Sequence, residues 1–253
     1  MKRTLTAFVA LLTLGLAANA QINYKWQTVR MDSTYDEIKD PAATDIIAKH
    51  SPRLAPLQEI IGYSNDEYAS KRPDSGLSNF AADIILETAE KVCGSHVELA
   101  LTNFGGIRTS LPKGAVRVYD IYSIFPFDNS IVVFDIKGAD LYKFLEKQAR
   151  RPEAFSNVRM DIVDKKITFL EIDGKPFDKD KVYKFATIDF LMDGGDGIQL
   201  SQVAMNLQRS EMFLRDAIVD YIKQMNAEGK KIDLKADGRV TFTYTTPKPE
   251  KKK

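Results

Sequence analysis

The chain has 253 residues, 44% of them hydrophobic, which is enough to bury one sizeable core. Its 36 basic and 35 acidic residues nearly cancel, so no overall charge attracts a nucleic acid polymer or a membrane surface. One cysteine excludes an intramolecular disulfide framework, and two histidines are too few for a histidine-rich metal centre.

The N-terminus has the features of a secretory signal peptide over residues 1–20. Lys2 and Arg3 form a basic start, an apolar stretch runs from Ala7 to Ala17, and Ala18-Asn19-Ala20 is a small-residue cleavage site. Because the apolar stretch is shorter than the ~18–20 residues that cross a bilayer, we expect no membrane span. The sequence therefore predicts export to the periplasm or the extracellular space. Cleavage leaves 34 basic against 35 acidic residues, a net charge of −1.

The segment after the leader predicts little regular structure at first. Residues 21–41 are expected to be a lead-in with a short strand at Tyr24–Val29. Apolar residues between Pro41 and Gly62 then indicate helical structure, which Pro52 and Pro56 interrupt.

A clearer helix is predicted from about Ser78 to Val92, because its apolar side chains recur on one face. Cys93 follows this helix, and we expect it to be a small buried hydrophobe. Val97–Leu101 predicts a short apolar strand that runs into Asn103 and the Gly105-Gly106 pair. Glycines at such a place permit unusual backbone conformations and a close approach of a ligand to the main chain.

The second half of the chain is rich in predicted strands. A helix follows Gly138, Asp173-Gly174 has turn chemistry, and a further helix is expected from Ser210, as its cap, to Ala227. The strands are expected at Ile131–Ile136, Val158–Val163, Lys166–Ile172, Val182–Ile188 and Val240–Tyr244. Separate helices around a strand-rich middle favour an α+β fold with a mixed β-sheet.

Three short segments carry the residue types of a nucleotide pocket. Aromatic rings can stack on a base, an arginine can hold phosphate oxygens with two parallel hydrogen bonds, and Asp or Asn can accept from ribose hydroxyls. The segments are Thr102–Arg108, Phe125–Asn129 and Phe190–Gly197.

In their order and spacing these segments resemble the C-terminal, substrate-binding domain of 5′-nucleotidases, over about residues 42–245. Residues 246–253, which follow, are expected to be a disordered basic tail. The resemblance implies a nucleotide or nucleoside ligand. Phe127 and Phe190 correspond to two rings that stack on the faces of the base. Arg108 corresponds to a phosphate contact, and Asp196 to a carboxylate that accepts from the ribose hydroxyls.

The same resemblance implies that Asn103 lies near the base or the phosphate, beside Gly105 and Gly106. The family also has an arginine shortly before an acidic residue and an Asn at a helix start. Here Lys71-Arg72-Pro73-Asp74 precedes Asn79. The ungapped register places Lys71 at the arginine's position, and a one-residue slip places Arg72 there. Only Arg offers the bidentate fork.

Full-length members of the family resemble two-domain enzymes, in which a metallophosphoesterase domain holds two metal ions around Asp-x-His and Gly-Asn-His-Glu strings. Neither string occurs in this sequence, and His50 and His96 are isolated. We therefore predict no catalytic residue, metal ligand or cofactor in this chain, and expect divalent metals in a partner catalytic domain.

Three functions follow from these observations. The first is a nucleotide-binding substrate-recognition domain that works with a separate metallophosphoesterase chain. The second is a non-catalytic nucleotide- or nucleoside-binding protein for capture or sensing. Metal-independent hydrolysis by the chain itself is disfavoured, because the hydroxyls of Thr109 and Ser110 have no histidine nearby in sequence.

Overall fold

The computed structural model describes residues 25–28 and 40–245, and the chain divides into two compact units, 1–51 and 52–253. The predicted signal peptide and the predicted tail lie outside the described residues. Residues 25–28 adopt no strand, so the described part of the strand predicted at Tyr24–Val29 does not form. Helix α2 (Pro41–Leu54) has no buried residue and continues past Pro52.

The helical structure predicted up to Gly62 ends earlier in the structure. A short 3₁₀ turn η2 (Ala55–Gln58) leads into strand β1 (Ile60–Ser64), which pairs antiparallel with β3 (Gly114–Arg117). Ile61 is buried in this strand. Residues 60–64 form a strand because they pair with β3, which lies fifty or more residues later in the chain. The local apolar spacing could not indicate this pairing.

The central sheet has five strands in the order β10-β4-β9-β2-β5. Strand β2 runs parallel to β9, and the other neighbours are antiparallel. The strands are β2 (Leu99–Thr102), β4 (Ser130–Lys137), β5 (Ala154–Ser156), β9 (Val182–Ile188) and β10 (Met205–Phe213). The predicted strands at 97–101, 131–136 and 182–188 are therefore confirmed.

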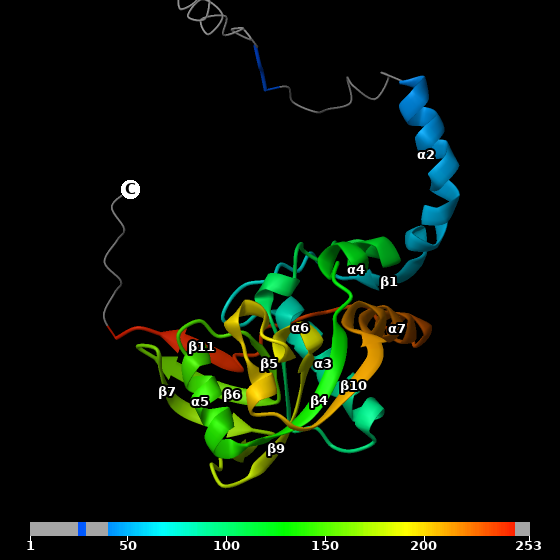
Figure 1. Cartoon of the computed structure of the whole chain (residues 1–253). Coiled ribbons are helices and arrows are strands. Elements are labelled where there is room, and N and C mark those ends of the chain that lie inside the picture. Colours follow the sequence, from blue (N-terminus) through cyan, green and yellow to red (C-terminus); the bar gives the residue numbers. More distant parts are fainter. Residues whose placement is uncertain (1–24, 29–39, 246–253) are drawn as a thin grey trace, which may run out of the picture. The chain divides into compact units, whose positions relative to one another are not determined.

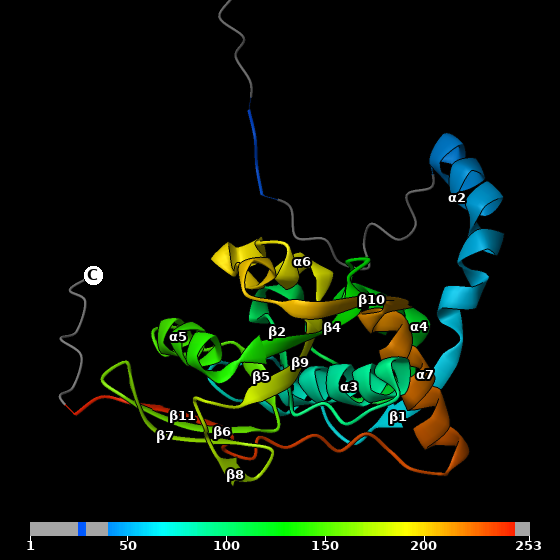
Figure 2. The same cartoon turned by 60° about the horizontal axis from the view of Figure 1, so that its bottom comes forward.

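Two predicted helices pack on this sheet. Helix α3 (Gly76–Cys93) runs along one face (Figure 2) and contacts β2, β5 and β9. Helix α5 (Gly138–Gln148) contributes Phe144, whose ring lies 6.0 Å from that of Phe185 in β9. Phe185 in turn lies 5.0 Å from Phe134 of β4. These tilted aromatic pairs are part of the core between α5 and the sheet.

A smaller sheet has the order β11-β6-β7-β8, and the predicted strands at 158–163, 166–172 and 240–244 are confirmed in it. Asp173 and Gly174, with φ of 55° and 67°, make the turn after β7. The strands are β6 (Val158–Val163), β7 (Lys166–Ile172), β8 (Lys175–Pro176) and β11 (Val240–Thr243). Together the five-stranded sheet, the four-stranded sheet, the β1–β3 pair and the helices form the expected α+β fold.

Two further expectations are corrected. Ser210 does not cap a helix: it lies in β10, its hydroxyl donates to the Ile131 carbonyl at 2.8 Å, and helix α7 begins only at Leu214 and ends at Ala227. Pairing of β10 with β4 outweighs the helical spacing of the residues after Ser210. Cys93 is half-buried at the end of α3, with its sulfur 3.3 Å from the Ser95 carbonyl. No helix within 25–28 and 40–245 is long and apolar enough to span a membrane.

Candidate functional site

The topology brings the three predicted segments to one edge of the central sheet. Strands β2 and β9 are parallel neighbours, so the loops that follow Thr102 and Ile188 leave the sheet at the same edge. Strand β4 is antiparallel to β9 and pairs Ile131 with Ile188, so the Phe125–Asn129 segment enters the sheet there as well. The short helix α6 (Asp189–Met192) lies at this edge (Figure 1).

Asn103 is the buried residue on which the site is built. Its side-chain amide donates to Asp196 Oδ2 at 2.6 Å, which joins the first segment to the third. Its Oδ1 atom is buried and has no partner among the described residues. A Cβ on Gly106 would lie 2.8 Å from this Oδ1, and one on Gly105 would lie 3.4 Å from Asp196 Oδ2. The glycine pair therefore provides space, since neither residue has a positive φ.

Phe127 lies on one side of Asn103. The two residues, with Gly106 and Asn129, line a small hollow at the sheet edge. The Phe127 side chain is 47% exposed, whereas the neighbouring Phe125 is buried in the core. The informative feature is the buried polar side chain of Asn103, and the exposed face of Phe127 lies beside it.

The Phe190 ring packs on the backbone of Gly195, the residue that precedes Asp196. A Cβ on Gly195 would lie 2.4 Å from the Phe190 ring, so the ring rests directly on the Gly195 backbone. The ring is 44% exposed, and its backbone N–H donates to Asp189 Oδ1 at 2.7 Å. Asp196 has a φ of +53°, a left-handed conformation that Asp tolerates better than most residues.

The structure brings Arg72, and not Lys71, to the glycine loop. The Arg72 guanidinium lies 4.4 Å from the centre of the Phe104 ring and donates to Glu153 Oε1 at 2.7 Å. The other oxygen of Glu153 accepts from the Phe104 N–H at 2.7 Å. Lys71 is exposed, and its backbone N–H donates to Ser75 Oγ at 3.1 Å.

Arg108 is exposed and folds back over the same loop. Its Nη1 donates to the Gly105 carbonyl at 3.1 Å, and within the described part of the chain it makes no ion pair. Most of its donors therefore face solvent beside the glycine loop.

Two residues of this edge lie outside the predicted segments. Glu153 is buried and holds both Arg72 and the Phe104 backbone, as above. Arg215, at the start of α7, forms an ion pair with Asp128 and stacks 4.4 Å from the centre of the Tyr122 ring. Its contacts fix the chain on the C-terminal side of Phe127.

Glu153 and Arg215 were not predicted from the sequence, because the strands next to them, β5 and β10, were not predicted either. β5 pairs antiparallel with β2, matching Ala154 to Thr102, and so brings Glu153 to the site edge. β10 pairs antiparallel with β4, matching Phe213 to Ser130, and so brings Arg215 there. No local motif surrounds either residue, and only the pairing reveals them.

A metal centre requires a cluster of donor side chains around one ion. Among residues 25–28 and 40–245, no cluster of three or more His, Cys, Asp or Glu side chains could hold a metal ion, so the residues present do not fit a two-metal centre. His96 is bound instead between Glu90, at 2.7 Å, and Asp173, at 3.1 Å. Hydrogen bonds to Asp173 and Glu90 raise the pKa of His96 above its ordinary value.

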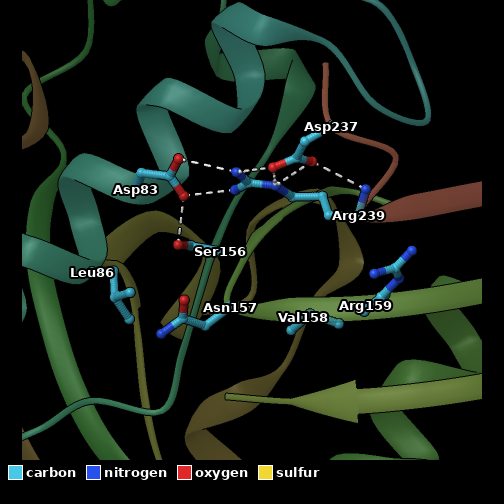
Figure 3. Close-up of a pocket in the computed structure, with 8 residues that line it drawn as sticks. All are labelled: Asp83, Leu86, Ser156, Asn157, Val158, Arg159, Asp237 and Arg239. Carbon is cyan, nitrogen blue, oxygen red and sulfur yellow. Dashed lines mark hydrogen bonds and ion pairs between the residues drawn. The ribbon is translucent and has the colours of Figure 1, made fainter. Parts of the chain in front are cut away.

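A separate hollow of about 550 Å³ is lined by residues of α3, of the segment that joins β5 to β6, and of the segment before β11 (Figure 3). Arg239 donates there to Asp83, at 2.6 and 3.1 Å, and to Asp237. Burial opposes its charge, but these hydrogen bonds outweigh burial and raise the pKa of Arg239. Both carboxylates bind the one guanidinium, so this cluster holds the segment before β11 against α3.

Comparison with known protein families gives one direct match. The family model described as the C-terminal domain of 5′-nucleotidase matches residues 55–202. This range includes all three segments at the sheet edge, together with Arg72 and Glu153.

Individual relatives agree with this match. Protein UshA of Yersinia enterocolitica is 27% identical over 192 residues, which cover 70% of this chain and 34% of that protein. Cell wall protein Lmo0130 of Listeria monocytogenes is 26% identical over 255 residues, covering 88% of this chain and 31% of that protein. The chain thus spans about a third of the length of these curated relatives.

A solved structure shows the same fold. The crystal structure of a 5′-nucleotidase precursor from Thermus thermophilus superposes with a TM-score of 0.70 at 24% sequence identity. The superposition covers 81% of this chain and 43% of that one.

Proposed function

Because the chain belongs to the family of 5′-nucleotidase C-terminal domains, we propose that its unit from residue 52 onward binds a nucleotide and presents it for hydrolysis of the phosphate ester. The observation that carries the proposal is the buried Asn103, which is bonded to Asp196 and lines a hollow with Phe127. A core packing role explains neither its unpartnered Oδ1 nor the exposed rings beside it.

Phe127 and Phe190 are assigned to the two faces of the base. Both rings are about half exposed at one edge of the sheet, although side chains of this size are mostly buried. Stacking of a base on an aromatic ring contributes about 1–3 kcal/mol and accepts any base. The proposal therefore specifies a nucleotide or nucleoside ligand and leaves the base open.

Arg108 and Asp196 are assigned to the phosphate and the ribose. The Arg108 guanidinium has free donors in a planar fork that suits phosphate oxygens. Asp196 uses Oδ2 to accept from Asn103, which leaves Oδ1 to accept from a ribose hydroxyl. Arg72, paired with Glu153, holds the glycine loop through its contact with the Phe104 ring, whereas Lys71 offers only its positive charge.

The hydrolytic centre is proposed to lie outside these 253 residues, on a separate metallophosphoesterase chain that supplies the divalent metals. The sequence contains neither metal-binding string of the family, and the residues described in the structure do not fit a two-metal site. On this proposal the chain binds and orients the nucleotide, because an oriented phosphate ester reacts far faster than a free one.

Export to the periplasm or the cell exterior is part of the same proposal. It is supported by the signal-peptide features of residues 1–20 and by a relative described as a cell wall protein.

Reconstitution tests the proposal. The chain alone, with Mg²⁺, Mn²⁺, Zn²⁺ or Co²⁺, should release no phosphate from nucleoside monophosphates at an enzymatic rate of about 1 per second or faster. Adding a secreted metallophosphoesterase from the same genome should raise catalytic efficiency above that of the partner alone. The increase should disappear with Phe190→Ala and persist with Phe169→Ala, an exposed ring in the smaller sheet.

The opposite outcomes are equally informative. Rapid turnover by the chain alone would contradict the division of labour. Nucleotide binding without any gain from candidate partners would favour a capture or sensing protein instead.

A further inference from the structure

A pocket of about 520 Å³ continues from Gly105 and Asp196 toward helix α5. One wall is formed by α5 and the residues up to Glu153, and the other by the segment from Gly197 to Val203. The volume falls within the usual range of small-molecule sites. One end is shared with the proposed nucleotide site, and the remainder has no role in it.

Four basic side chains line this pocket, and two of them are neutralised inside it. Arg72 pairs with Glu153 at 2.7 Å, and Lys143 pairs with Asp140 at 3.0 Å. These four charges cancel, which leaves two basic side chains and the carboxylate of Asp196 as the remaining charges of the lining.

Lys147 and Arg151 are the two that remain. In the part of the chain that the structure describes, neither side chain makes an ion pair or a hydrogen bond. Between them Gln148 is buried and also lines the pocket, and its Oε1 has no partner within the same ranges. Gln148 Oε1 is an acceptor, so the unpaired donors of this end are those of Lys147 and Arg151, and both are positively charged.

We propose that this basic end of the pocket binds a phosphate carried on the 2′ or 3′ oxygen of the ribose. The inference rests on the proposed function, in which Asp196 faces the ribose hydroxyls. A substituent on one of these oxygens enters the pocket that begins at Asp196, while the other hydroxyl still donates to Oδ1. Arg151 can then grip the phosphate bidentately, and Lys147 adds a point charge.

Calorimetry with adenosine 5′-monophosphate and adenosine 3′,5′-bisphosphate tests the inference, with the 2′,5′-bisphosphate distinguishing the two oxygens. One bisphosphate should bind about ten-fold more tightly than the monophosphate at low salt. In a Lys147→Gln/Arg151→Gln double variant this ratio should fall to about one, with the affinity for the monophosphate unchanged. Arg150→Gln, a neighbouring exposed arginine outside the pocket, is the matched control and should keep the ratio.

Two results would overturn the inference. One is equal affinity of the wild type for the monophosphate and both bisphosphates. The other is a tighter bisphosphate complex that the double variant retains. If no adenine nucleotide or nucleoside binds, the proposed function itself fails, and this outcome is distinct from the other two.

Discussion

Adding one methyl group at Gly195 is expected to weaken ligand binding while leaving the stability of the fold nearly unchanged. The Cβ of Gly195→Ala would lie 2.4 Å from Phe190 Cε1 and 2.5 Å from Cδ1 and Cζ. Carbon atoms in contact normally lie about 3.5–4.0 Å apart, so the ring must move by roughly 1 Å or more. The backbone of Gly195 has no positive φ, and alanine adds no backbone strain there.

The displaced ring can no longer lie flat on the base. We therefore expect Gly195→Ala to lose the stack of Phe190, about 1–3 kcal/mol, or roughly a 5- to 150-fold weaker Kd for adenosine. The melting temperature should change little, because the ring is 44% exposed and free to rotate outward.

A double-mutant cycle measures whether the effect passes through the ring. Calorimetry on wild type, Gly195→Ala, Phe190→Ala and the double variant gives the coupling energy directly. In the Phe190→Ala background, Gly195→Ala should cost nothing further. Wild-type affinity in Gly195→Ala, or the same loss in both backgrounds, would show that the Phe190 ring is not stacked on the base.

Three other residues give further predictions. Arg215→Met should release the loop that carries Phe127 and weaken adenosine binding about ten-fold, with no added loss in a Phe127→Ala background, measured by calorimetry. Arg239→Met should lower the free energy of unfolding by about 1–2 kcal/mol in urea melts, since two half-exposed carboxylates lose their shared partner; a change below about 0.3 kcal/mol would contradict this. The raised pKa of His96 means that its ion pairs stabilise the fold below about pH 6.5 and are lost as the pH rises through the raised value. The melting temperatures of wild type and His96→Gln should therefore differ most near pH 5.5 and converge by pH 9, and a constant difference would contradict the assignment.

The elements that the sequence predicted well are those whose pattern is local. The strands at 158–163, 166–172 and 182–188 have the predicted bounds, because apolar alternation and the Asp173-Gly174 turn determine them without reference to distant partners. Strands β1 and β10 were missed because their residues have helix-like apolar spacing, and pairing with β3 and β4 overrides it.

The candidate site likewise contains residues with a local sequence pattern and residues that only distant pairing brings there. The three motif segments were visible in the sequence, and parallel pairing of β2 and β9 explains why they lie at one edge. Glu153 and Arg215 were not visible, since they lie 49 and more than 80 residues from the groups that they hold. Lys71 and Arg72 also differ in a contact that the local sequence did not reveal, because Arg72 donates to the distant Glu153.

The most direct test of the account is calorimetric titration of the chain without residues 1–20 against adenosine and adenosine 5′-monophosphate. We predict that both bind with one-to-one stoichiometry, that Phe127→Ala and Phe190→Ala weaken both ligands by about 1–3 kcal/mol, and that Arg108→Ala weakens only the monophosphate. A folded wild-type chain that binds neither ligand, or variants that bind both as the wild type does, would contradict the central claim that this edge of the sheet is a nucleotide site.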